Sequence, residues 1–200
     1  MIMNKIKTVL IGDSGVGKTC IFQRLDNDSF KEEMTSTVGG SFCNITLQND
    51  KGTYYEIGLW DTAGQERFRN IIPLYFQRAT FVILMYDISS RDSFNGLKKW
   101  AEIIKDKGPE NTQLFLVGNK SDLEKERAIP MSEGEKQAEE IGAVFFCELS
   151  AKTRIGLDIL LKEITDRCEV LSSISFEVSA LQGPSVKTGA EVLRKSECRC

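Results

Sequence analysis

The feature that most constrains the fold is a glycine-rich stretch between an apolar run and a helical pattern. Residues 12–19 read Gly-Asp-Ser-Gly-Val-Gly-Lys-Thr and fit the pattern G-x-x-x-x-G-K-[ST]. The run from Lys5 to Ile11 before them indicates a strand, and Cys20 to Leu25 after them indicates the first turns of a helix. Glycines at such a turn let successive backbone N–H groups point at an anion beside the helix N-terminus. The stretch therefore predicts a loop that cradles phosphate groups.

The residue types within this loop indicate a nucleotide held together with a divalent cation. The Lys18 ammonium would supply positive charge to the outer phosphates, and the Thr19 hydroxyl suits Mg²⁺, which takes hard oxygen ligands. A glycine-rich turn that merely precedes a lysine is the alternative, but the full pattern arises by chance in roughly one chain in a hundred of this length. We expect the phosphate contacts to come from Ser14, Gly15, Val16, Gly17, Lys18, Thr19 and Cys20.

Composition limits the class of protein. A chain of 200 residues with 41% hydrophobic and 28% charged residues suits one globular domain, with room for a tail. The net charge of −3 argues against a nucleic-acid binder that relies on a broad basic surface. Histidine is absent, which excludes Ser-His-Asp triads and histidine-containing zinc sites. We see no secretory leader and no run long enough to span a membrane, and we expect a cytoplasmic protein.

Apolar runs alternate with helical patterns, which predicts an α/β layer fold. We expect a six-stranded, mostly parallel sheet with one antiparallel edge strand and about five helices. The predicted strands cover residues 5–11, 42–48, 53–60, 80–87, 113–118 and 143–147, and the predicted crossover helices cover residues 92–105, 132–141 and 156–170. Turn residues at 49–52 predict a hairpin at the sheet edge, and Ser132 is placed to cap its helix.

The character of the sequence changes after Leu171. Residues 172–200 contain six serines, the pair Gly183-Pro184 and aliphatic residues without clear periodicity. We therefore divide the chain into a domain of residues 1–171 and a flexible C-terminal tail of residues 172–200.

A second motif, Trp60 to Phe68, follows the third predicted strand. Asp61 would lie at the carboxyl end of that strand, where open α/β sheets bind ligands, and its carboxylate can hold Mg²⁺ through water. Gly64 can bring a backbone N–H to the outermost phosphate, and Gln65 can orient an attacking water. An Asp-x-x-Gly alone is a common turn. Together with the loop at Gly12, it predicts hydrolysis of a bound nucleotide.

Two polar stretches that follow later strands predict a site for guanine. In Asn119-Lys120-Ser121-Asp122, the Asp122 carboxylate offers acceptors that match the ring N–H and amino group of guanine, whereas adenine has no matching donors. Backbone N–H groups of Ser150-Ala151-Lys152 could meet the guanine carbonyl. Each stretch alone is a polar turn, but in this company they indicate guanine selectivity.

Together these motifs resemble those of the small GTPases of the Ras superfamily, and within it the Rab family. The resemblance covers about Lys5 to Val170 and implies a P-loop NTPase of the small G domain type, which cycles between GDP and GTP and hydrolyses GTP slowly. It implies Gln65 and Lys18 as catalytic residues and Thr19, Thr37 and Asp61 as Mg²⁺ ligands. The family pattern also implies switch segments at about residues 30–42 and 61–78 that the γ-phosphate orders.

The same resemblance gives roles to two residues that composition does not single out. Phe30 is implied to pack against the base, and Thr37 to close on the cation when GTP is bound. As alternatives, Phe30 could be an ordinary core residue at a helix end, and Thr37 an ordinary loop hydroxyl.

Similarity to the Rab family in particular rests on three stretches and on the end of the chain. The stretches are 67–69, 75–76 and 84–88. Cys198 and Cys200 form a terminal C-x-C that resembles a site for two geranylgeranyl groups, whereas a C-a-a-X box is excluded because Glu197 stands where its cysteine would be. Two lipid chains anchor a protein stably where one does not. A metal or redox pair is the alternative for these cysteines.

The family resemblance implies a role in vesicle-mediated membrane traffic, on the cytosolic face of an intracellular membrane. Its implied partners are a guanine-nucleotide exchange factor, a GTPase-activating protein, an escort protein, a GDP-dissociation inhibitor and effector proteins. We expect a monomer and no nucleic acid. Phe42, Trp60 and Tyr75 match the aromatic triad that family effectors contact, although each could be an edge-packing residue. Ser41 and the pair Gln77-Arg78 depart from the residues usual in the family.

Two other functions stay open from the sequence. One is a guanine-nucleotide-binding scaffold without hydrolysis, against which the presence of Gln65 and Thr37 argues. The other is a P-loop phosphotransferase, which would need a second substrate pocket and an arginine-rich lid.

Overall fold

The computed structural model describes residues 5–31, 40–62 and 75–181, with side chains up to residue 173. The chain divides into two compact units, residues 1–168 and residues 169–200. Every strand of the sheet lies in the first unit.

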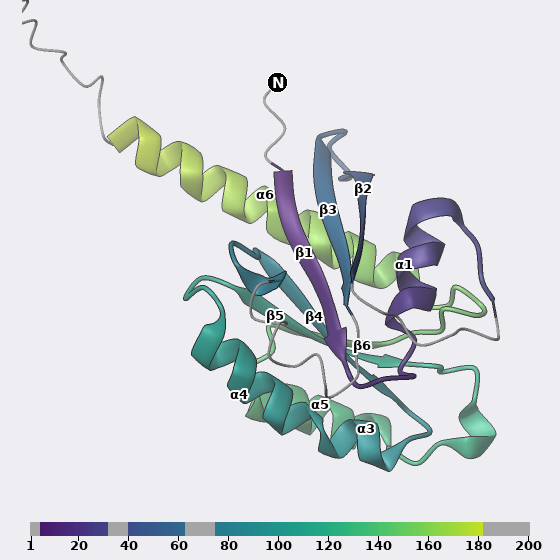
Figure 1. Cartoon of the computed structure of the whole chain (residues 1–200). Coiled ribbons are helices and arrows are strands. Elements are labelled where there is room, and N and C mark those ends of the chain that lie inside the picture. Colours follow the sequence, from purple (N-terminus) through teal and green to yellow (C-terminus); the bar gives the residue numbers. More distant parts are fainter. Residues whose placement is uncertain (1–4, 32–39, 63–74, 182–200) are drawn as a thin grey trace, which may run out of the picture. The chain divides into compact units, whose positions relative to one another are not determined.

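The first unit is built on a six-stranded sheet with the strand order β2-β3-β1-β4-β5-β6 (Figure 1). Its strands are β1 (Lys5–Gly12), β2 (Gly40–Gln48), β3 (Tyr54–Thr62), β4 (Phe81–Asp87), β5 (Gln113–Asn119) and β6 (Phe145–Glu148). β2 pairs antiparallel with β3, and the other neighbours pair parallel. The predicted α/β class, the number of strands and the antiparallel edge strand are confirmed.

The turn between β2 and β3 forms around one asparagine side chain. Asn49 Oδ1 accepts hydrogen bonds from the backbone N–H groups of Lys51 at 3.1 Å and Thr53 at 2.8 Å. The Gly52 N–H donates to the Asn49 carbonyl at 3.0 Å, and Gly52 has a φ of 79°, in the left-handed region. These local bonds fix the register of the edge hairpin, as the turn residues at 49–52 predict.

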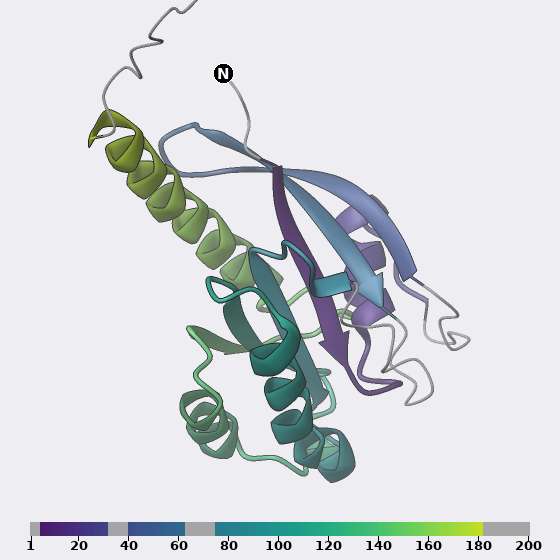
Figure 2. The same ribbon diagram turned by 60° about the vertical axis from the view of Figure 1, so that its left-hand side comes forward.

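Helices cover both faces of the sheet (Figures 1 and 2). They are α1 (Lys18–Asn27), α3 (Arg91–Asn95), α4 (Leu97–Lys107), α5 (Met131–Glu140) and α6 (Leu157–Leu181), together with a short 3₁₀ turn, η2 (Glu124–Glu126). On one face, Leu97 and Trp100 of α4 and Ala138 of α5 pack in one core with Val9 and Ile11 of β1. This core buries one side of the central strands.

Three helix boundaries differ from the sequence prediction. The predicted helix over 92–105 is divided at Gly96 into α3 and α4. α5 begins at Met131 after Pro130, so that Ser132 lies inside the first turn and makes no capping bond. α6 continues to Leu181, inside the range expected to be a flexible tail, because residues 157–181 contain neither glycine nor proline and Gly183-Pro184 follow only beyond its end.

The boundary that we set at residue 171 thus cuts through α6, and the remainder of the expected tail, from residue 182, lies outside the described residues. Among the helices that the structure describes, none combines the length and the apolar character needed to cross a membrane.

Candidate functional site

The glycine-rich loop connects the end of β1 to the start of α1. Gly12 and Gly17 adopt φ angles of 144° and 95°, and a Cβ on either would collide with a neighbour, 2.3 Å from the Met85 carbonyl oxygen and 2.2 Å from Asn119 Nδ2. Only glycine fits both positions. The N-cap of α1 is Gly17, so no side chain caps the N-terminus of this helix, which begins directly after the loop. The predicted phosphate-binding loop is therefore formed by the backbone itself.

Lys18, the first residue of α1, directs its ammonium back into this loop. Its Nζ donates to the carbonyl oxygens of Gly12 at 2.9 Å and Asp13 at 2.7 Å. Burial lowers the pKa of Lys18 to about 8, and the negative charges of Asp61 and Asp13 oppose that shift. The loop thus contains a buried positive charge whose proton is held less tightly than that of an ordinary lysine.

Thr19 and Asp61 lie side by side, as their predicted shared role requires. The Thr19 hydroxyl donates to Asp61 Oδ2 at 2.7 Å. Burial raises the pKa of the Asp61 carboxyl, while the Thr19 hydrogen bond, the Lys18 charge and a hydrogen bond from the Thr62 backbone lower it. The other oxygen, Asp61 Oδ1, is buried and has no hydrogen-bond partner among the described residues. A buried acceptor without a donor normally has an unseen partner, such as an ion or a water.

Asn119, at the end of β5, forms hydrogen bonds to two loops of the site. Its Nδ2 donates to the Val16 carbonyl at 2.8 Å, and its Oδ1 accepts the Ala151 N–H at 3.2 Å. The Asn119 side chain therefore joins the phosphate-binding loop to the segment 150–152. The sequence predicts Asn119 as a site residue but does not indicate that its side chain joins these two loops.

The segment expected to select guanine is assembled around Asp122. Its Oδ1 accepts a hydrogen bond from the Ser150 hydroxyl at 2.5 Å, and that hydroxyl also accepts the Thr153 N–H at 3.0 Å. Lys120 has a φ of 67° and forms an ion pair with Asp87 at 2.6 Å. The structure thus brings together the two polar stretches that are separate in the sequence.

Two contacts of the site could not be predicted from any pattern in the sequence. The indole N–H of Trp100 in α4 donates to Asp13 Oδ1 at 2.9 Å, which ties that helix to the phosphate-binding loop. Phe30 lies beside α1, with its ring centroid 5.5 Å from the guanidinium carbon of Arg24. A buried tryptophan usually finds a partner for its N–H, and this rule is the only hint that the sequence offers for Trp100.

The three aromatic residues singled out by the sequence form one cluster. The ring centroids of Phe42 and Trp60 are 4.8 Å apart, and those of Trp60 and Tyr75 are 6.2 Å apart. Lys5 and Lys7 place their ammonium groups 5.1 Å from the Phe42 ring and 4.9 Å from the Trp60 ring. Phe42 is 43% exposed, so the cluster reaches the surface.

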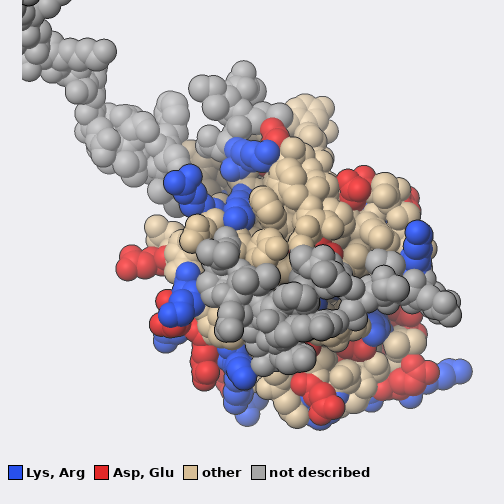
Figure 3. Space-filling model, in the orientation of Figure 1, with Lys and Arg blue, Asp and Glu red and all other residues tan. Residues whose placement is uncertain are grey.

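On the face of the molecule seen in Figure 3, acidic and basic side chains are interspersed.

Five residues of the sequence prediction lie outside the described residues. They are Thr37, Gly64, Gln65, Cys198 and Cys200.

Comparison with known proteins identifies what the chain is similar to. A sequence model of the Ras family matches residues 7–170. The chain is 38% identical over 174 residues to the human Ras-related protein Rab-12, covering 87% of this chain and 70% of that protein. It is 38% identical over 165 residues to mouse Ras-related protein Rab-31, covering 82% and 84%. It is 41% identical over 160 residues to Ras-related protein RABE1d of Arabidopsis thaliana, covering 80% and 73%.

Proposed function

This chain belongs to the Ras family, and we propose that it is a Rab-like GTPase that switches between GDP-bound and GTP-bound forms in vesicle-mediated membrane traffic. The observation that carries the proposal is the joining, through Asn119, of a phosphate-binding loop to a segment suited to guanine. One amide side chain contacts both, so that phosphates and base can be bound by a single preorganised site.

The phosphates are assigned to the loop and to the first turn of α1. A lysine ammonium has three N–H donors, and two of those on Lys18 are directed at the carbonyl oxygens of Gly12 and Asp13. The third remains for a phosphate oxygen. Backbone N–H groups of residues 14–20 complete the cradle, with the positive end of the α1 dipole behind them.

The residues near the phosphates fit Mg²⁺. Thr19 and Asp61 offer a hydroxyl and a carboxylate, and Asp61 Oδ1 is a buried acceptor that lacks a donor among the described residues. Mg²⁺ usually takes one or two such protein oxygens and completes its shell with phosphate oxygens and water. When bound, it neutralises charge that develops on the phosphates. Thr37 is the third proposed ligand, assigned from the family pattern.

The base is assigned to Asp122 and the segment 150–152. The Asp122 carboxylate accepts from the ring N–H and amino group of guanine. The Ser150 N–H donates to the Ile155 carbonyl at 2.9 Å, whereas the Ala151 N–H has a longer bond of 3.2 Å to Asn119. We therefore assign the guanine carbonyl to the Ala151 N–H. Phe30 packs against the base in this proposal.

Hydrolysis is assigned to water that Gln65 orients, with Lys18 balancing the charge that develops on the phosphates. We expect the intrinsic rate to be slow, and a partner that supplies an arginine would accelerate it by ~10³ to 10⁵. Replacing Gln65 by Leu keeps side-chain bulk and removes the amide oxygen and nitrogen. Bound GTP should then persist in a single-turnover assay, with and without an activating protein. Hydrolysis by Gln65→Leu at the wild-type rate would refute the role of Gln65.

Partners and location follow from the family pattern and from the end of the chain. We propose that Phe42, Trp60 and Tyr75 present a surface to effectors, and that exchange factor, activating protein, escort protein and GDP-dissociation inhibitor act on the same domain. Geranylgeranyl groups on Cys198 and Cys200 would anchor the protein to the cytosolic face of a membrane. Replacing both cysteines by Ser should move the protein to the soluble fraction of a cell lysate. Unchanged membrane association would contradict the lipid assignment.

A further inference from the structure

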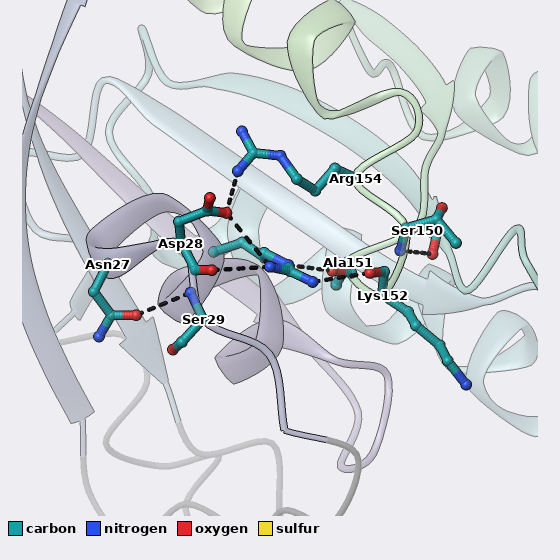
Figure 4. A network of polar contacts seen from close by, with 9 residues as sticks. Asn27, Asp28, Ser29, Ser150, Ala151, Lys152 and Arg154 are labelled. Carbon is teal, nitrogen blue, oxygen red and sulfur yellow. Dashed lines mark hydrogen bonds and ion pairs between the residues drawn. The ribbon is translucent and has the colours of Figure 1, made fainter.

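Arg24 donates hydrogen bonds to Asp28, Ala151 and Lys152, three residues that are labelled in the polar network of Figure 4, beside the proposed base site. It belongs to α1, and its guanidinium donates to the carbonyl oxygens of Ala151 and Lys152, from Nε at 2.7 Å and from Nη2 at 2.9 Å. These two carbonyls belong to the segment assigned to the guanine base. A forked, charged donor of this kind fixes the orientation of the segment as well as its distance.

The same guanidinium also holds the segment that follows α1. Nη1 donates to the Asp28 carbonyl at 2.9 Å and lies 3.4 Å from the Asp28 carboxylate. The guanidinium carbon is 5.5 Å from the Phe30 ring centroid, within the range of a cation–π contact. Asp28 ends α1 with a φ of 56°, so the chain turns sharply at the residue that Arg24 binds. Arg24 therefore contacts both protein segments that are proposed to enclose the base.

Because Arg24 is largely buried, its contacts stabilise the two segments more than an exposed ion pair would. The Arg24 side chain is 15% exposed, whereas the second arginine at Asp28, Arg154, is 53% exposed. Charge-assisted bonds that are shielded from water are stronger than solvent-exposed ion pairs, which contribute little. Arg154 also forms an ion pair with Asp28 but gives no bond to residues 151 or 152 in the described structure. Arg154 thus offers a comparison arginine that joins the same loop to Asp28 only through an exposed ion pair, without the buried fork on residues 151 and 152.

We propose that Arg24 is a positioning residue that slows the release of guanine nucleotide by holding residues 150–152 and residues 28–30 in one arrangement. The inference rests on the proposed function, because it assigns the base to these segments. A nucleotide can leave only when the segments around its base move apart, and changes in affinity within one site appear mainly in the dissociation rate. Removing the fork should therefore speed release without changing the chemistry at the phosphates.

The test uses the full chain loaded with fluorescent GDP and Mg²⁺ and chased with excess GDP. Arg24→Gln should release GDP roughly tenfold faster than wild type, which corresponds to the loss of about one good hydrogen bond. Arg24→Lys is the diagnostic variant, because lysine has the same charge and nearly the same helix propensity but lacks the planar fork. It should also release GDP several-fold faster. Arg154→Gln should stay within about twofold of wild type.

A second measurement separates positioning from a loss of folding. The single-turnover rate of hydrolysis of bound GTP should be the same in Arg24→Lys as in wild type. Wild-type GDP release in Arg24→Lys would overturn the inference, as would an equal acceleration by Arg154→Gln. If Arg24→Gln does not fold, Arg24→Lys alone decides. Failure of the wild-type chain to retain any guanine nucleotide would refute the proposed function itself, and this inference with it.

Discussion

The Thr19 hydroxyl donates to Asp61 Oδ2 at 2.7 Å and so joins the first turn of α1 to the end of β3. These residues are 42 positions apart in the chain, and the parallel pairing of β1 with β3 brings them together. The contact leaves one oxygen of a buried carboxylate without a donor in the described structure. The proposed cation site is built on this pair.

Replacing Thr19 by Val should remove one Mg²⁺ ligand and the donor to Asp61. Retention of GDP should then require a higher concentration of Mg²⁺, since Asp61 and the proposed ligand Thr37 remain. Unfolding in urea with EDTA should show that the free energy of unfolding falls by about 1–3 kcal/mol, because a buried carboxylate oxygen loses its bond. Thr165→Val is a matched control, since that buried hydroxyl bonds within α6. An unchanged Mg²⁺ requirement for GDP retention in Thr19→Val would contradict the assignment.

Replacing Asn119 by Ala should separate the phosphate-binding loop from the segment 150–152. We expect the affinity for GDP to fall at least roughly tenfold, because two buried bonds to backbone groups are lost. Asn49→Ala is the control, since Asn49 is also buried and also bonds backbone groups, but in the β2–β3 hairpin. Equal loss of GDP affinity in the two variants, measured by titration calorimetry, would mean that Asn119 acts only through stability.

Replacing Asp122 by Asn should change which base is preferred. An amide presents one acceptor and one donor where the carboxylate presents two acceptors. The amino group of guanine would then face the amide NH₂ of Asn, so that two donors oppose each other. Xanthine has a carbonyl in place of that amino group, and this carbonyl would accept a hydrogen bond from the amide NH₂. Competition between GDP and XDP for the purified variant should favour XDP. Continued preference for GDP would show that Asp122 does not read the base.

The affinity for GDP should weaken as pH rises through about 8. Burial lowers the pKa of Lys18 to about 8 in the ligand-free protein, and bound phosphates would favour the protonated ammonium. Affinity is therefore at its full value below that pH and lost above it, by roughly tenfold between pH 7 and pH 9. Lys18→Arg should bind with a shallower pH dependence, because arginine stays charged. Titration of guanine itself affects both proteins equally, so identical pH profiles would contradict the role of Lys18.

Hydrophobic pattern predicted most of the fold because the central strands are buried on both faces. Every residue of β4, for example, is buried, and a continuous apolar run of that length is typical of a parallel strand between two helical layers. The hydrophobic pattern predicts a strand that is too short where polar residues continue it. β3 runs on to Thr62, whose hydroxyl donates to the Leu10 carbonyl at 2.7 Å, and hydropathy cannot show such a bond.

The site was partly predictable for a related reason. Residues that follow parallel strands meet at one sheet edge, so the proximity of Asp61 to Thr19 and of Asp122 to Ser150 could be expected from topology. The contacts of Arg24 with Ala151 and of Trp100 with Asp13 could not, because they join residues 127 and 87 positions apart through single side chains. Such contacts have no periodicity in the sequence.

The most direct test of the central claim is release of inorganic phosphate by the purified full chain with Mg²⁺. GTP and ATP are compared under single-turnover conditions, each with and without a nucleoside monophosphate as acceptor. We predict slow release of phosphate from GTP, none from ATP, and no effect of the acceptor. Transfer of the phosphoryl group to the acceptor would indicate a phosphotransferase. GTP that stays bound and intact would indicate a scaffold, and equal hydrolysis of ATP would contradict the assignment of Asp122 to guanine.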